Sequence, residues 1–149
     1  MSDLCRTFQD IADSVWRDIA AAHKMGLPYT KETITENNLL HLCRRHPDEM
    51  RVFAFPKNNT KDSELTEKET GADWEWWFGG ESGWLGLRVQ AKKIKFPEDS
   101  FEELGFRGKK GDQLNNLIEQ AEKFELNPVY CLYVSRPEKV SPNYCPQTS

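Results

Sequence analysis

The stretch from Ala72 to Phe96 decides the expected fold, and it reads ADWEWWFGGESGWLGLRVQAKKIKF. Its first part, 72–78, is dominated by aromatic residues, which favour β-strands. Glycine and small polar residues then fill 79–83, and a glycine-rich turn between two strand-forming runs is typical of an antiparallel hairpin. The second run, 84–96, stops at Pro97, since proline cannot donate to a strand ladder. The sequence therefore predicts a β-hairpin in this stretch.

The first strand of this hairpin is expected to carry acidic side chains on one face. Side chains alternate across a strand, so Asp73, Glu75 and Trp77 share one face, and Trp74 and Trp76 share the other. Core packing is the usual fate of such aromatic rings. We therefore assign Trp74 and Trp76 to the core and leave the acidic face for a functional site.

The second strand is expected to supply the complementary polar groups. Arg88, Gln90 and Lys92 point the same way by the same alternation. If the polar faces of both strands coincide, carboxylates, an amide oxygen and an ammonium group meet on one side of the sheet. Hard oxygen ligands bind Mg²⁺, and a nearby cation can stabilise a reacting phosphate or orient water. The sequence thus predicts a phosphodiesterase-type site there.

The segments before the hairpin predict two helices, a strand and a loop. Apolar residues recur at helical spacing within 1–26, and Gly26 with Pro28 ends that pattern. A second helix is expected from the Thr33 to Glu36 capping-box pattern up to His46. The run 51–55 predicts a short strand, and the polar segment 57–70 predicts an exposed loop.

The segments after the hairpin predict one more helix and one more strand. Asp112 is a candidate N-cap for a helix that ends before Asn127-Pro128. The run 129–134 is apolar at nearly every position, which suits a strand covered on both faces and paired in parallel. The tail 135–149 is expected to be irregular. The resulting order, α-α-β-β-β-α-β, predicts an α/β fold with a mixed central sheet flanked by helices.

Composition indicates a single globular domain over 1–149, with its core in 33–134. The 149 residues are 38% hydrophobic and 30% charged, in the range of globular proteins. No apolar run approaches the roughly 20 residues that a membrane helix needs, so we expect a cytoplasmic protein without membrane contact. The net charge of −4 argues against general coating of nucleic acid. The four cysteines form no CxxC pair, and reduced thiols are expected.

Two motifs carry a family resemblance. ETGADWEW at 69–76, followed by LRVQAKK at 87–93, resembles the PD-(D/E)xK restriction-endonuclease-like superfamily, particularly its Mrr-like branch, which uses Gln-x-Lys. The resemblance covers the chain after the first helix. It implies a restriction-endonuclease-like core and an endonuclease that uses Mg²⁺ or Mn²⁺ to hydrolyse DNA phosphodiester bonds. It also suggests a role in bacterial anti-phage defence, with nucleic acid, DNA above all, as partner.

The resemblance also implies roles for individual residues. Asp73 takes the position of the central metal-binding aspartate, and Gln90 that of a second metal ligand. The Ala91 carbonyl supplies a further oxygen ligand, and Lys92 takes the position of the catalytic lysine. Related proteins often add an acid from the preceding helix, and Glu36 is the candidate here. Its alternative role is to close the helix cap.

Further residues compete for the remaining positions around this site. Glu69 and Glu75 are alternative acids, and Trp77, Lys93 and Gln113 are candidates for substrate contact, although helix flank is the alternative for Gln113. Most of the superfamily has glutamate at the position of Gln90, and a neutral ligand weakens metal binding. Two alternatives therefore stay open: a catalytically inactive nuclease-like module for binding or assembly, and a nuclease directed at RNA. Specificity is expected to come from homo-oligomerisation or a partner protein.

Overall fold

The computed structural model describes residues 3–57, 65–96, 100–101 and 113–136. These residues form a mixed α/β fold with a five-stranded sheet flanked by helices, as predicted from the sequence. Two short elements, α3 and β4, were not expected. The elements in chain order are α1 (Asp3–Met25), α2 (Lys31–Arg45), β1 (Met50–Ala54), α3 (Glu67–Thr70), β2 (Trp74–Gly80), β3 (Gly83–Lys95), β4 (Ser100–Phe101), α4 (Gln113–Lys123) and β5 (Asn127–Tyr133).

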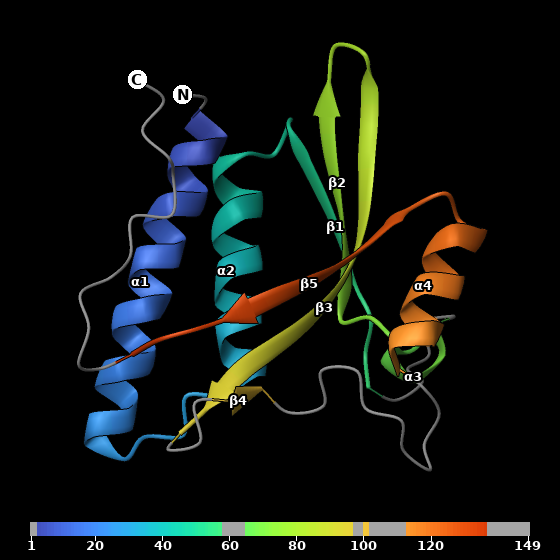
Figure 1. Cartoon of the computed structure of the whole chain (residues 1–149). Helices are drawn as coiled ribbons and strands as arrows, with labels where there is room; N and C mark the ends of the chain where they lie inside the picture. The colour runs from blue at the N-terminus through green and yellow to red at the C-terminus, as the bar shows by residue number, and fades with distance from the viewer. Residues whose placement is uncertain (1–2, 58–64, 97–99, 102–112, 137–149) are drawn as a thin grey trace, which may run out of the picture.

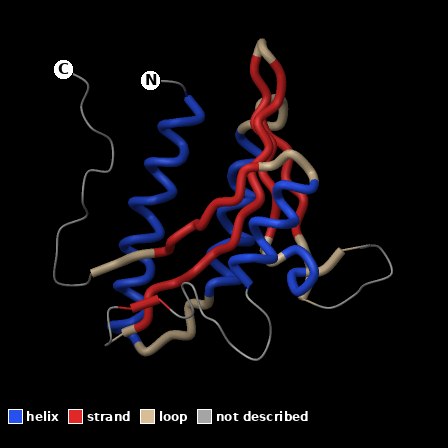
Figure 2. The backbone as a smooth tube through the Cα atoms, turned by 45° about the vertical axis from the view of Figure 1, so that its right-hand side comes forward, coloured by secondary structure: helices blue, strands red, loops and turns tan. Residues whose placement is uncertain are grey.

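The sheet is built around the long strand β3. Strands β1, β2 and β3 follow one another in antiparallel pairs, and β5 pairs with β3 in parallel. The short strand β4 pairs with the end of β3. The tight β2–β3 hairpin extends away from the body of the molecule (Figure 2). Both the predicted hairpin and the predicted parallel pairing are therefore confirmed.

Helices cover the two faces of the sheet differently. The long helices α1 and α2 lie side by side on one face, whereas α3 and α4 lie on the other (Figure 1). A hydrophobic core cluster forms under α1 and α2, and it includes Trp74, as predicted. Its fully buried members are Val15, Ile19, Ile34, Trp74, Val89, Ala91, Ile94 and Tyr133. The opposite face of β2 and β3 is left for polar side chains and α4.

The beginning of α2 differs from the prediction. The N-cap is Thr30, whose side chain accepts a hydrogen bond from the Thr33 backbone N–H at 3.2 Å. Thr33 therefore lies inside the helix, and the predicted capping box of Thr33 and Glu36 is wrong. The extended backbone of Thr30, with φ −81° and ψ 162°, is the conformation that an N-cap residue requires. The helix consequently starts at Lys31.

The predicted loop at 57–70 contains the short helix α3. Thr66 caps this helix, and its hydroxyl and backbone N–H complete a capping box with Glu69. Gly71 ends the helix in the left-handed conformation, with φ 68°, which glycine adopts without steric cost. The polar composition of this segment favoured a loop, although the segment contains a helix with an N-cap and a C-cap residue.

The last strand is less covered than predicted. Within the described residues β5 pairs only with β3, and Leu132 is 44% exposed. The prediction that the apolar run is covered on both faces is therefore wrong at Leu132. The expected cap at Asp112 and the tail 137–149 lie outside the described residues.

The cysteines for which the structure gives a position are reduced. Cys5, Cys43 and Cys131 form no disulfide in the described part of the chain, as expected, and Cys145 lies outside the described residues. None of the helices in the described part of the chain combines the length and apolarity needed to cross a membrane.

Candidate active site on the polar sheet face

Asp73 directly precedes β2, and its side chain contacts Gln90 on β3. The register pairs Trp74 with Val89, so the preceding residue, Asp73, faces Gln90. Two backbone hydrogen bonds hold Asp73 between neighbouring strands: its N–H donates to the Val89 carbonyl at 2.8 Å, and its carbonyl accepts from Phe55 N–H at 2.8 Å. The carboxylate therefore projects from a fixed backbone position on the polar face.

The Asp73 carboxylate accepts hydrogen bonds from three donors. Oδ2 accepts from the Gln90 side-chain Nε2 at 2.6 Å and from the Ala91 backbone N–H at 2.7 Å. Oδ1 accepts from the Lys31 ammonium at 2.7 Å. The structure thus brings Asp73 together with the first two residues of the Gln90-Ala91-Lys92 triplet.

Lys92 joins this cluster through a chain of amide groups. Its ammonium donates to Gln113 Oε1 at 2.8 Å, and Gln113 Nε2 donates to Gln90 Oε1 at 2.8 Å. Gln90 Nε2 in turn donates to Asp73. The chain has a fixed polarity, because every donor points from the ammonium end toward the carboxylate end. Gln113 therefore lies in the cluster and is not merely a flank of α4.

Two charged residues of the cluster were missed in the sequence. Lys31, at the start of α2, lies 2.7 Å from Asp73 Oδ1 and 3.9 Å from Glu67 Oε1. Burial, and then the negative charge of Asp73, raise the pKa of Glu67 above its ordinary value. The pattern Thr66-x-x-Glu69 could have predicted α3 and with it the position of Glu67. No sequence signal points to Lys31.

Gly71 connects the cluster to α4. Its φ of 68° is combined with very close packing, because a Cβ at this position would lie 2.6 Å from the Leu117 nitrogen and 2.8 Å from the Gln113 carbonyl oxygen. The end of α3 thus lies against the first turn of α4, just before Asp73 in the chain. The close packing of Gly71 against α4 thus holds Gln113 near the sheet, where its side chain reaches Gln90.

Family comparison adds a relationship but no biochemical role. The model of the family described as "Family of unknown function (DUF6615)" matches residues 4–148. The chain belongs to the DUF6615 family. A search of curated proteins gave no match.

Glu36 and Lys93 of this DUF6615 protein point away from Asp73. Glu36 is exposed on α2, five residues after Lys31 and therefore rotated by about 140° around the helix. Lys31, not Glu36, is the α2 residue that reaches the carboxylate. Lys93 follows Lys92 and so faces the opposite side of β3, where its ammonium donates to the Tyr29 carbonyl and burial lowers its pKa.

The other candidate acids have structural partners of their own. The Glu69 carboxylate accepts from the Thr66 hydroxyl at 2.8 Å, and the Thr66 hydrogen bonds lower its pKa. Glu75 pairs with Arg88, and it also accepts from Trp77 Nε1 at 3.2 Å.

Trp77 shares the polar face with Asp73 but lies farther along β2. It is four residues beyond Asp73, which corresponds to about 13 Å along a strand. There it lines a surface pocket with Arg51, Phe53, Glu75 and Trp84. The structure therefore does not bring Trp77 to the Asp73 cluster.

The cluster has a donor set that suits a hard divalent cation in this DUF6615 protein. No three His, Cys, Asp or Glu side chains come together among the residues the structure describes. The oxygen donors are instead the Asp73 and Glu67 carboxylates, with the Gln90 amide and the Ala91 carbonyl beside them. The Lys31 ammonium contacts both carboxylates, which marks a position suited to positive charge. Mg²⁺ and Mn²⁺ accept such oxygen sets and retain water ligands.

Proposed function

We propose that this protein is a metal-dependent nuclease that hydrolyses DNA phosphodiester bonds, with Mg²⁺ or Mn²⁺ as cofactor. The observation that carries the proposal is the single hydrogen-bonded network joining Asp73, Gln90, Ala91 and Lys92 through Gln113. These groups were expected from the resemblance to the Mrr-like branch of the PD-(D/E)xK superfamily. A cytoplasmic role in anti-phage defence, with a second copy or a partner that provides specificity, belongs to the same proposal.

In this proposal one group of residues would bind the metal ion, and another stabilises negative charge on the phosphate. Asp73, Glu67, the Gln90 amide oxygen and the Ala91 carbonyl would hold the cation. The bound metal ion would supply Lewis-acid stabilisation of the phosphate and a water of lowered pKa. Lys92 stabilises negative charge that develops on the phosphate as water attacks. Lys31 balances the negative charge of the two carboxylates, Asp73 and Glu67.

The polarity of the amide chain couples Gln90 to Lys92. Gln90 directs its NH₂ group at Asp73, so it must rotate its amide to offer an oxygen to a cation. That rotation presents NH₂ to Gln113, which must rotate in turn. The Gln113 amide then directs NH₂ at the Lys92 ammonium and no longer accepts its hydrogen bond. Rotation of both amides would therefore remove the hydrogen bond that Lys92 donates to Gln113.

A second candidate function is a catalytically inactive binding or assembly module. The observation in its favour is that Asp73 already accepts from Lys31, Gln90 and Ala91. A carboxylate with three donors, one of them charged, is compensated without a divalent cation. The inactive module therefore predicts a folded protein that neither cleaves nucleic acid nor binds Mn²⁺.

Cleavage assays separate these functions. Purified protein is incubated with supercoiled plasmid DNA and, separately, single-stranded RNA, in the presence of Mg²⁺, Mn²⁺ or EDTA. We expect metal-dependent DNA cleavage that falls on the order of 100-fold or more in Asp73→Asn and in Lys92→Met. The matched controls are the exposed residues Asp10 and Lys24, as Asp10→Asn and Lys24→Met, which should retain wild-type rates.

Each result assigns one function. Cleavage of RNA but not of DNA would identify the RNA-directed alternative with the same site. Unaltered cleavage by folded Asp73→Asn would exclude this cluster as the active site. A lack of cleavage, together with no Mn²⁺ binding in electron paramagnetic resonance titrations, would establish the inactive module.

A further inference from the structure

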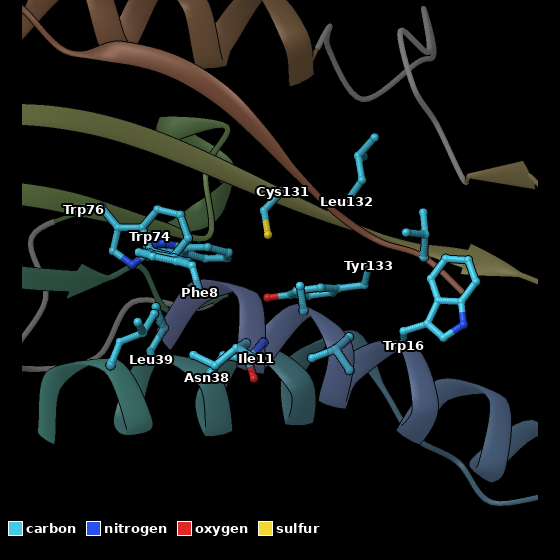
Figure 3. A pocket seen from close by; sticks show the side chains of 14 residues that line it. Phe8, Ile11, Trp16, Asn38, Leu39, Trp74, Trp76, Cys131, Leu132 and Tyr133 are labelled. Atoms are coloured by element: carbon cyan, nitrogen blue, oxygen red, sulfur yellow. The ribbon is translucent and has the colours of Figure 1, made fainter. Parts of the chain in front are cut away.

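A pocket of about 440 Å³ lies between α1, α2 and the sheet (Figure 3). Protein interiors are normally close-packed, and this volume is within the range of small-molecule sites, about 300–1,000 Å³. The pocket is partly open, and its walls are mostly apolar. Its lining includes Phe8 and Ile11 from α1, Leu39 from α2, and Trp74 and Trp76 from β2.

The two tryptophans at one end of the pocket have unused hydrogen-bond donors. The indole Nε1 atoms of Trp74 and Trp76 are buried, and neither has a hydrogen-bond partner within the described structure. Trp74 is only 1% exposed. A buried donor without a partner costs about 1–3 kcal/mol, and buried indole N–H groups usually find an acceptor.

The two indoles cannot both satisfy each other. Their ring centroids are 5.2 Å apart, and the rings are T-shaped with an interplanar angle of 71°. In a T-shaped pair the edge of one ring meets the face of the other. Within this pair at most one N–H can point at the other ring, and the Trp76 ring also lies edge to face with Phe8, 5.6 Å away at 85°. A ring face is a weaker acceptor than a carbonyl oxygen, and neither N–H has a hydrogen-bond partner within the described structure.

The pocket is electrically neutral. No charged side chain is among its described lining residues. Burial raises the pKa of the Cys131 thiol to about 11 and also raises that of the Tyr133 hydroxyl, so both are neutral near pH 7. Tyr133 is bonded to Thr35 at 2.9 Å, whereas Asn38 adds a carboxamide. Among the described lining residues a buried carboxylate or ammonium would find no counter-charge, so its burial would be costly.

We propose that this pocket binds a neutral, mainly apolar small molecule whose carbonyl-type oxygen accepts a hydrogen bond from the Trp74 or Trp76 indole. The apolar body fills the space lined by α1, α2 and β5, and the acceptor lies at the tryptophan end. This site is independent of the proposed nuclease function, since it uses the opposite face of β2 and β3. It assigns a ligand-binding role to the aromatic half of the hairpin.

The experiment uses a fluorescent probe of this chemistry. Prodan, 6-propionyl-2-dimethylaminonaphthalene, is neutral and apolar and carries one ketone, and its emission moves to shorter wavelength in an apolar site. Its partner probe, N,N-dimethyl-2-naphthylamine, lacks the ketone. We expect saturable binding of both probes. Trp74→Phe/Trp76→Phe should weaken prodan binding by roughly two- to tenfold and leave the affinity of the ketone-free probe unchanged.

A second pair of variants locates the binding. Ala12 lines the pocket, whereas Ala21 is exposed elsewhere on α1. Ala12→Trp should abolish binding of both probes, and Ala21→Trp should leave it intact, with circular dichroism confirming that each variant is folded. Three outcomes would overturn the proposal: no saturable prodan binding, unchanged binding in Ala12→Trp, or equal loss of both probes in the double tryptophan variant.

Discussion

Two acidic residues on the same face of β2, Asp73 and Glu75, have different kinds of partner. Glu75 pairs with Arg88, whose side chain is only 2% exposed. Asp73 pairs with Lys31, which is 21% exposed and comes from a separate helix. Arg88, the partner of Glu75, belongs to the neighbouring strand β3, whereas Lys31, the partner of Asp73, reaches the sheet from α2.

The Arg88 side chain is held by hydrogen bonds and by two aromatic rings. Its guanidinium donates to Glu75 through two nitrogens and to the Gln120 carbonyl of α4 through a third. The rings of Phe55 and Phe124 lie 5.5 Å and 4.9 Å from its central carbon. A planar fork with several donors suits such a buried position. The Glu75–Arg88 pair therefore acts as a structural link between the sheet and α4.

The Asp73 cluster has more exchangeable components. A lysine on a flexible stem supplies the charge, and two rotatable amides supply much of the remaining hydrogen bonding. Such groups can rearrange when a ligand arrives. A shared sheet face therefore does not make two carboxylates equivalent, because the rigidity of the partner decides whether a carboxylate can change its ligands.

The largest effect is expected when the rigid pair is broken. Arg88→Met leaves Glu75 without its counter-charge beneath α4, and removal of one partner from a buried pair costs about 3–5 kcal/mol. Lys31→Met removes the charged partner of Asp73, but Asp73 still accepts from Gln90 Nε2 and the Ala91 N–H. The loss should therefore be smaller, about 1–3 kcal/mol. Urea denaturation of both variants measures the difference.

A double variant provides the control for the arginine experiment. Glu75→Leu/Arg88→Met removes both charges, so it should be more stable than Arg88→Met alone. Equal losses in Arg88→Met and Lys31→Met would contradict the distinction between a rigid and an exchangeable pair.

A smaller effect is expected at the contact that holds α4 against the Asp73 cluster. Gly71→Ala places a methyl group against the backbone of Leu117 and Gln113 and also forces a left-handed alanine. Gly26 has nearly the same φ, 67°, but a Cβ added there would meet no atom within 4 Å. Gly71→Ala should therefore lose about 1–3 kcal/mol more than Gly26→Ala in thermal denaturation. If both lose the same amount, the close approach to α4 does not contribute.

Strand alternation predicted which residues share a face but not which partners they have. Asp73, Gln90 and Lys92 were expected on one side of the hairpin, and the structure places them there. Glu75 satisfied the same rule and was therefore an equal candidate. Its separation from the site depends on Arg88 and α4, a tertiary arrangement that spacing along a strand does not contain.

The missed residues come from segments distant from the hairpin. Lys31 is 42 residues from Asp73 in the chain, and only the packing of α2 against the sheet brings them together. Glu67 belongs to a four-residue helix in a segment whose polar composition favoured a loop. Its cap residues, Thr66 and Gly71, were visible in the sequence, so α3 was predictable from local rules, whereas Lys31 required the fold.

The smallest effect is expected in the pH dependence of stability, through Glu67, the second carboxylate beside Lys31. Its pKa is raised by burial and by Asp73, so the folded protein binds this proton more tightly than the unfolded chain does. Below the ordinary glutamate pKa, Glu67→Gln should leave stability unchanged. As pH rises through the raised pKa, wild type loses stability relative to the variant, and the difference then becomes constant. Urea denaturation from about pH 4 to about pH 8 covers this window.

Glu32, whose pKa is lowered by its hydrogen bond to Lys57, provides the opposite control: Glu32→Gln should become less stable than wild type as pH rises. Parallel curves for wild type and Glu67→Gln would show that folding does not raise the pKa of Glu67, and the proposed pairing of Glu67 with Asp73 around one cation would lose this support.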